Sequence, residues 1–363
     1  MYVNKLSPSL IELGTRIHPY RSLKSVFFEL LVQYSNKDIL VTIYIAEGQR
    51  HYLEDGWNYI LNVTNLTITS YSDSLDSSGK ATIVPTQIPQ SAQSQKAAFS
   101  LLASTDLNIE EEINNYEYTE SENALLRDNQ ATICILRSNV EINNVDFERQ
   151  IIDYDQDTML FEMIYLQDKT LQLTNIDINV TGRILHSQYP MNGVFENITI
   201  DAYGLRDGFR FDIDCNYPEA IVVNEVHFNY LKVVTTTDRT FIQSPNIVFY
   251  QGPGNLTVLN SDFADHYMSF TDVASTIHSE KNSGCLPADG LLQTVMLDNI
   301  TTSLPDNQEP ESKANFIAIT AMSNLNRQIK NYVYNQHYIN FKNSFYGNLL
   351  SYGGALDELY IIN

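Results

Sequence analysis

The side chains best placed to carry chemistry in this sequence are amides and carboxylates at recurring spacings. Six tripeptides fit the Asn-x-Thr pattern of N-glycosylation, and each has Val, Leu or Ile in the middle. In a strand, an inward middle residue would turn Asn and Thr outward, within reach of a glycosyltransferase. We therefore predict N-linked glycans and a secretory route, with the acceptor residues Asn62, Asn65, Asn179, Asn197, Asn255 and Asn299. The alternative is that strands of this fold are simply rich in Asn and Thr, with outward Thr favouring β structure and Asn forming ladders at turns.

Three carboxylates stand at alternate positions in the segment DYDQD. Asp153, Asp155 and Asp157 would lie on one side of an extended chain. Hard oxygen ligands of this kind suit Ca²⁺, so we predict a calcium site here. The segment is not an EF-hand, because Thr158 stands where that loop needs Gly and Ile164 where it needs Glu. A solvated acidic edge is the competing interpretation.

Cysteines are few and widely spaced. Cys134, Cys215 and Cys285 form no CxxC pair and no Cys/His cluster that would suggest zinc. At most one disulfide is possible, and the pair we favour is Cys215 with Cys285, since both lie in segments containing Gly, Pro or Asn. Three unpaired thiols are the alternative.

The charge balance restricts the partners. The formal net charge is −22 and the pI is about 4.5, so phosphate backbones and anionic lipids repel the chain. We predict no nucleic-acid partner, whereas Ca²⁺ and basic surfaces are attracted.

No apolar run approaches the roughly 20 residues of a membrane helix, which predicts no membrane span. The first residues lack the apolar core of a signal peptide, so either the protein is not secreted or the chain begins after a cleaved leader.

The elements that must position these residues begin with a helix. From Ser22, apolar residues follow the i, i+3, i+4, i+7 spacing of an amphipathic helix of about three and a half turns. Two β-type runs follow it, DILVTIYIAEGQRHYL from Asp38 and NVTNLTITS from Asn62. This order resembles the opening of right-handed parallel β-helix proteins of the pectin-lyase-like superfamily, in which a capping helix precedes a strand, a G-x-Y turn and a second strand. In IYIAEGQRHYL the turn is one residue longer.

A short Asn-bearing strand pattern then recurs along the chain. It reads NVEINNVDF, LQLTNIDI, VFENITI, VVNEVHF, LTVLNSDF, LQTVMLDNITT and YINFKNSF, with its asparagines at Asn144, Asn175, Asn197, Asn224, Asn260, Asn299 and Asn343. The intervals of 22 to 44 residues suit a solenoid, whose units are too small to bury their own apolar faces. We predict an all-β, right-handed parallel β-helix with an N-terminal capping helix.

The predicted domain organisation is a single elongated body. Residues 1–36 form the N-terminal segment and capping helix, and residues 37–363 form the β-helix. A polar and acidic stretch at about 71–128 interrupts the rhythm and is interpreted as a projecting insertion; a linker between two domains is the alternative. The end, INFKNSFYGNLLSYGGALDELYIIN, resembles the FxxN and GGA(I/L) repeats of polymorphic outer-membrane autotransporters and related surface proteins. Because the chain stops within such a coil, we expect the polypeptide to continue or another subunit to stack there.

These features favour an extracellular structural or adhesive glycoprotein, such as a filament or surface-coat subunit that assembles by end-to-end stacking. The alternative is a polysaccharide lyase or glycoside hydrolase of the β-helix type. Of the polygalacturonase-like motif set only RQIK, from Arg327, is present. The best local candidates for a lyase site are Arg206, Arg210, Asp212 and Asp214, although Arg210 and Asp212 are explained more simply by an ion pair on one strand face. A bacterial passenger-like surface protein is a third interpretation.

Overall fold

The structure, a computed structural model of the 363-residue chain, describes most of the strands and the connections near the N-terminus. The described residues are 1–34, 37–54, 58–72, 79–86, 131–148, 159–164, 169–187, 191–202, 205–212, 224–234, 246–251, 254–264, 267–271, 293–303, 317–320, 334–341, 350–353 and 358–359.

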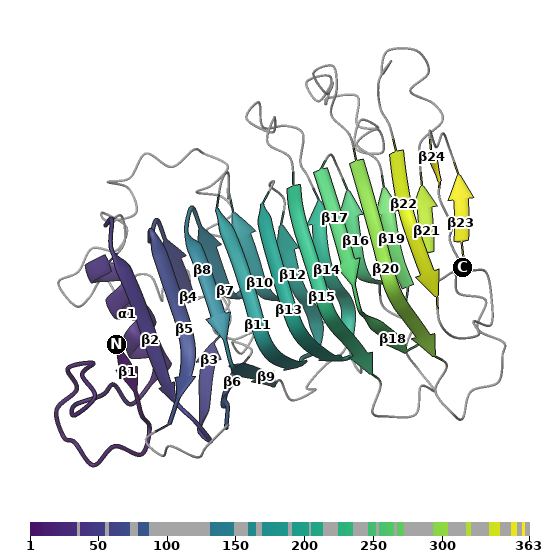
Figure 1. The fold of residues 1–363 in the computed structure, drawn as a ribbon. Helices are drawn as coiled ribbons and strands as arrows, with labels where there is room; N and C mark the ends of the chain where they lie inside the picture. The colour runs from purple at the N-terminus through teal and green to yellow at the C-terminus, as the bar shows by residue number, and fades with distance from the viewer. Residues whose placement is uncertain are drawn as a thin grey trace, which may run out of the picture.

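Two all-parallel sheets make up the body (Figure 1). The larger sheet consists of β1 (Tyr2–Val3), β2 (Leu40–Ala46), β3 (Arg50–Glu54), β5 (Asn65–Tyr71), β6 (Ala81–Thr86), β8 (Asn139–Asn143), β9 (Val145–Glu148), β11 (Thr170–Asn179), β13 (Asn192–Asp201), β15 (Asn224–Val234), β17 (Gly254–Leu259), β18 (Asp262–Ala264), β20 (Gln293–Ser303), β22 (Tyr334–Phe341) and β24 (Glu358–Leu359). The smaller sheet consists of β4 (Asn58–Leu61), β7 (Ala131–Leu136), β10 (Met159–Ile164), β12 (Gly182–Ser187), β14 (Leu205–Asp212), β16 (Asn246–Gln251), β19 (Tyr267–Thr271), β21 (Ile317–Thr320) and β23 (Leu350–Gly353).

The chain crosses from one sheet to the other once in each coil, and each strand pairs with its counterpart in the coils before and after. From β10 onward the strands alternate between the smaller and the larger sheet, except that β17 and β18 follow each other in the larger sheet. Figure 1 shows the coils stacked side by side from the N-terminal to the C-terminal end. The parallel β-helix predicted from the recurring pattern is therefore confirmed.

The core is a set of inward rows that run along the stack. Leu173 of β11 lies opposite Ile142 of β8 on one side and Phe195 of β13 on the other, and all three are buried. Phe195 in turn stacks on Phe228 of β15, with ring centroids 4.7 Å apart. Because like residues repeat at the same position of successive coils, each coil buries the apolar face of its neighbours.

A helix covers the N-terminal end of the smaller sheet. Helix α1 (Leu23–Glu29) continues into the five-residue π-helix η1 (Leu30–Tyr34), and both contact β4. The hydroxyl oxygen of Ser22 caps α1 by accepting a hydrogen bond from the amide N–H of Ser25 at 3.1 Å. Leu23, Val26 and Phe27 are buried. The capping helix predicted from the apolar spacing is present, with its last part wound as a π-helix.

Part of the stretch predicted as an insertion belongs to the larger sheet. β6 lies inside the stretch predicted as an insertion, yet it pairs with β3 and β9 as part of the larger sheet, and Tyr71 ends β5. Residues 73–78 and 87–130, the rest of that stretch, lie outside the described residues. Within the described part of the chain, no helix has the length and apolar character needed to cross a membrane.

Candidate functional site

In a run of successive coils, the chain bends within the larger sheet at one residue with left-handed backbone. Six of these corner residues share one register position, with φ between 50° and 58°: Asn144, Asn175, Asn197, Tyr230, Asn260 and Asn299. Side chains other than Gly pay a steric cost in this conformation, and Asn tolerates it best. The repeated Asn of the sequence is thus required by the backbone.

The corner also breaks the inward and outward alternation of a strand. Glu196 and Asn197 are consecutive and both exposed, whereas Phe195 and Ile198 on either side are buried. Two outward residues in a row let the chain turn while its apolar residues stay inside on both arms. The outward amides of successive coils are thereby brought into one column, which we call the amide column.

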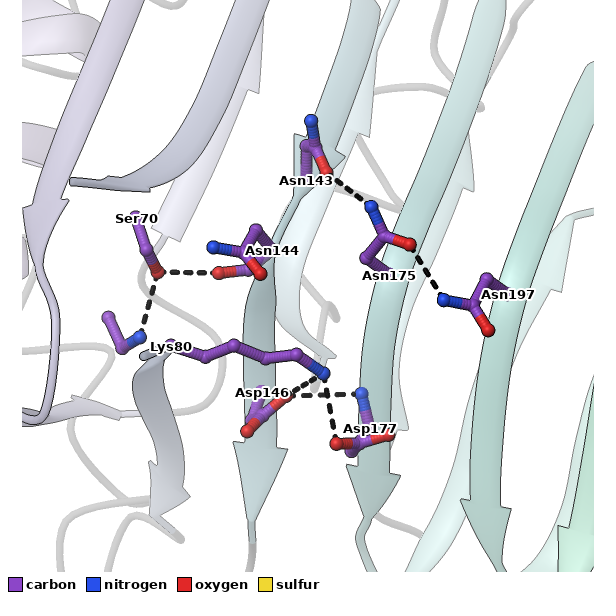
Figure 2. A network of polar contacts seen from close by, with 9 residues as sticks. Ser70, Lys80, Asn143, Asn144, Asp146, Asn175, Asp177 and Asn197 are labelled. Atoms are coloured by element: carbon purple, nitrogen blue, oxygen red, sulfur yellow. Dashed lines mark hydrogen bonds and ion pairs between the residues drawn. The ribbon is translucent and has the colours of Figure 1, made fainter. Parts of the chain in front are cut away.

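Amide side chains along this column bind one another (Figure 2). The Nδ2 group of Asn197 donates to Oδ1 of Asn175 at 2.7 Å, and Nδ2 of Asn175 donates to Oδ1 of Asn143 at 3.4 Å. A second run follows further along, where Asn299 donates to Asn260 at 2.6 Å and Asn260 donates to Asn229 at 3.0 Å. Each bond joins two coils on the outer surface.

The two runs are separated at Tyr230. In β15 the corner residue is Tyr230, and the preceding residue Asn229 supplies the acceptor for the next coil. The repeat position proposed at Asn224 is therefore wrong: Asn224 is the first residue of β15 and lies opposite Gly254, six positions before the corner. The apolar flanks of VVNEVHF resemble those of the other repeats, which explains the misalignment.

Ser70 occupies the equivalent place in the coil before Asn144 (Figure 2). Its hydroxyl accepts a hydrogen bond from the amide N–H of Ala81 at 2.7 Å and donates to the carbonyl oxygen of Asn144. The side chain thus links β5, the start of β6 and the corner of the next coil. A hydroxyl here stands at the place that amides take in the later coils.

Beside the column, one lysine binds two carboxylates from successive coils (Figure 2). The Nζ atom of Lys80 lies 2.9 Å from a carboxylate oxygen of Asp146 and 2.9 Å from one of Asp177. The amide N–H of Asp177 also donates to the Asp146 carboxylate at 3.2 Å. We call these three residues the lysine clamp. Its formal charge is −1, because one cation faces two anions.

The clamp keeps its lysine charged. Burial alone would lower the pKa of Lys80, but the hydrogen bonds to Asp177 and Asp146 and the charges of both carboxylates outweigh that effect, so the pKa is raised. Both carboxylates are occupied by the ammonium group. The arrangement therefore ties three coils together.

The predicted glycosylation sites lie on the outer surface. Their middle residues are all buried, as the strand parity predicts: Val63, Leu66, Val180, Ile198, Leu256 and Ile300. Asn65, Asn179, Asn197 and Asn255 are exposed, and Asn62 and Asn299 are partly buried. Asn197 and Asn299 belong to the amide column, and Asn255 donates to the Glu225 carboxylate at 2.7 Å. Whether any of the six carries a glycan stays a prediction.

The remaining predicted sites fall mostly where the structure makes no description. Asp153, Asp155 and Asp157 lie outside the described residues, as do Asp214, Cys215, Cys285 and Arg327. Of the lyase candidates, Arg206, Arg210 and Asp212 lie on β14, and only Arg210 has a described side chain, which is partly buried. Cys134 is buried on β7.

Within the described residues, no group of three His, Cys, Asp or Glu side chains converges to hold a metal ion.

Comparison with protein-family models, curated proteins and solved structures finds no match for this chain. Fold and surface together define a parallel β-solenoid protein. Its outer face carries an amide column and a lysine clamp that run along the solenoid axis.

The clamp is the feature that sequence reasoning missed. Lys80 and Asp177 are 97 residues apart, and the long interruption between β6 and β7 lies between them. A strand-by-strand alignment that placed Lys80 one residue before β6 would have put it opposite Asn144, two residues before Asp146 of β9. The stretch around Lys80 was instead assigned to an insertion.

Proposed function

We propose that this protein is an extracellular structural or adhesive glycoprotein, a rigid rod that serves as a filament or surface-coat subunit. The observation that carries the proposal is the continuity of side-chain contacts along the outer face. Asn143, Asn175 and Asn197 link three successive coils, and Lys80, just before β6, binds β9 and β11 beside them. Contacts of this kind between coils stiffen a solenoid, which suits a load-bearing role.

A relationship to pectin-lyase-like β-helices, and to surface proteins with FxxN and GGA(I/L) repeats, belongs to this proposal. It is supported by the parallel coils, the N-terminal helical cap and the motif around Phe341. Calcium bound at Asp153, Asp155 and Asp157 would add cross-links between acidic surfaces. A polysaccharide-cleaving activity has less support, because the two adjacent carboxylates Asp146 and Asp177 are both engaged by Lys80.

The geometry favours particular glycosylation sites. Asn65 and Asn179 are exposed and lie outside the amide column, so sugars attached there would project into solvent. At Asn197 and Asn299 the Nδ2 atom donates across the coils at 2.7 and 2.6 Å. A sugar on either nitrogen would replace one amide hydrogen and crowd the adjacent asparagine, which weakens the contact between coils.

Glycopeptide mapping of protein secreted from eukaryotic cells tests the proposal. We expect occupied sites at Asn65 and Asn179 and low occupancy at Asn197 and Asn299. Electron microscopy of the same preparation should show rods or fibres. Unmodified asparagine at all six sites, together with single short particles at every concentration, would overturn the proposed function.

A further inference from the structure

The N-terminal loop, residues 4–19, carries an unusual share of exposed apolar surface. Nine large apolar side chains are exposed among the described residues, and five of them are in this loop: Leu6, Leu10, Ile11, Leu13 and Ile17. Leu10 is 92% exposed and Ile17 is 79% exposed. Single exposed apolar residues need no explanation, but five within twelve positions mark a contact surface.

The loop presents these side chains from an ordered backbone. The amide N–H of Tyr2 donates to the carbonyl oxygen of Gly14, and that of Leu13 donates to the carbonyl oxygen of His18, both at 2.9 Å. Gly14 has φ +67°, and a Cβ atom there would lie 2.5 Å from the ring of Tyr20. The position therefore requires glycine, and the loop conformation depends on it.

Further contacts fasten the loop to the solenoid. The amide N–H of Lys5 donates to Oε1 of Gln49 at 2.7 Å, and Nζ of Lys5 lies 5.3 Å from the centre of the Tyr52 ring. The amide N–H of Arg21 donates to a carboxylate oxygen of Glu12 at 3.0 Å. Figure 1 shows the loop extending from the N-terminal end, beside β1. Its apolar side chains are thus held outward, which lowers the entropy lost on binding.

Strand pairing at this end is already satisfied. On its free side, β1 is bound by Tyr20, whose amide N–H donates to Tyr2 at 2.9 Å and whose carbonyl oxygen accepts from the amide N–H of Asn4 at 2.8 Å. The N-terminal strand of the smaller sheet, β4, is contacted by α1 and η1. A partner cannot add a strand at the covered side of β1, and the loop must therefore bind a partner through its side chains.

Charge indicates which partner fits. Residues 1–24 contain Lys5, Arg16, Arg21 and Lys24 against Glu12 alone, a formal side-chain charge of +3. The other residues contain 18 Lys and Arg (22 − 4) and 43 Asp and Glu (44 − 1), a charge of −25. An apolar loop with a basic surround is complementary to an acidic protein surface, and the body of this same chain is one.

We propose that the N-terminal loop docks onto the acidic body of a second copy of this chain. This inference rests on the proposed assembly of rods and supplies its contact. The two surfaces are different, so the interface is heterologous, and such interfaces generate open chains of subunits unless the geometry closes a ring. Leu10 and Ile17 are the apolar anchors, and the basic residues guide the approach.

Sedimentation velocity of the full chain tests this inference, with wild type compared to Leu10→Glu/Ile17→Glu. We expect the double variant to associate at least about tenfold more weakly, because both substitutions remove apolar anchors. Leu40→Glu is the matched control: Leu40 is 81% exposed, lies on β2 outside the loop, and its substitution should leave association unchanged. Circular dichroism should show that both variants are folded like wild type.

A mixing experiment tests the heterologous geometry. The double variant keeps the acidic acceptor surface, so a small fraction of it added to wild type should still be recruited at one end and should shorten the assemblies. Assemblies that persist unchanged in the double variant would overturn the loop contact and leave the proposed function standing. A wild-type chain that stays monomeric would overturn both. Loop-dependent flotation with anionic vesicles, without self-association, would show a lipid partner instead and overturn the second copy.

Discussion

At the scale of single residues, Tyr230 is the corner residue least suited to its backbone. It has φ +56° and a side chain 55% exposed, where the other corners in the column carry Asn. Replacing Tyr230 by Asn should raise the free energy of unfolding by about 1 kcal/mol, because Asn accepts left-handed backbone more readily and can join the two runs of amides. Urea unfolding of the variant measures the gain.

Tyr230→Gly separates the two contributions to that gain. Glycine removes the steric cost of the left-handed backbone but has no amide, so its gain should be smaller than that of Tyr230→Asn. Equal stability of the two variants would show that the backbone alone sets the effect and that the column adds nothing at this coil.

His51 makes the N-terminal coils sensitive to acid. Its side chain is buried on β3, its Nε2 atom has no hydrogen-bond partner among the described residues, and burial together with the nearby Lys5 lowers its pKa to about 4. In the unfolded chain this histidine binds a proton near pH 6.5, whereas in the folded chain it does so only near pH 4. The free energy of unfolding is therefore highest above pH 6.5 and falls as the pH drops toward 4. The decrease is roughly 3 kcal/mol at most.

Unfolding measured from pH 7 to pH 4 checks this expectation. His51→Leu should show a shallower loss of stability than wild type, since the side chain that must stay neutral is gone. His227→Leu, at an exposed histidine of β15, is the control and should follow wild type. Parallel curves for wild type and His51→Leu would assign the acid sensitivity to other groups.

At the scale of elements, the lysine clamp joins β9 and β11 to the segment that leads into β6. Lys80→Met should lower the free energy of unfolding by about 1 to 2 kcal/mol, because Asp146 and Asp177 then face each other without a cation. The difference in the free energy of unfolding between wild type and Lys80→Met should shrink in high salt. Lys37→Met removes the same charge at an exposed position and should have little effect.

The clamp also has a pH signature of definite sign. The pKa of Lys80 is raised in the folded chain, so the stabilisation is fully present below the unfolded-state pKa of about 10.4 and is lost as pH rises through the folded-state value. The wild-type advantage over Lys80→Met should therefore persist at neutral pH and disappear only in strong alkali. An advantage that vanished near pH 8 would contradict the clamp.

Elements also show where reasoning from sequence succeeded and where it stopped. The capping helix and the buried middle residue of each Asn-x-Thr follow from local spacing, and both were predicted. The left-handed corner was not predicted, because two outward residues in succession look like an error in a strict alternation. The places of Tyr230 and Lys80 could be found only by aligning the coils in space, because the sequence near each residue suggested another register.

At the scale of the whole molecule, the formal charge of −22 should govern the response to ions. Stacked coils place their outward side chains in columns, so acidic residues repel one another along the rod. Added NaCl should therefore raise the melting temperature by screening this repulsion. The same screening is expected from MgCl₂ at equal ionic strength, apart from any tighter binding of the divalent ion.

Calcium distinguishes a general acidic field from a specific site. If Asp153, Asp155 and Asp157 bind Ca²⁺, then CaCl₂ should raise the melting temperature more than MgCl₂ at the same ionic strength, because Ca²⁺ accepts irregular carboxylate cages that Mg²⁺ does not. The double variant Asp153→Asn/Asp155→Asn should lose the extra rise in melting temperature with CaCl₂ and keep the rise that both salts produce. Identical melting curves of wild type in the two salts would show that the segment is only a solvated acidic edge. The contacts within each rod would then come from the amide column and the lysine clamp, and those between rods from the N-terminal loop.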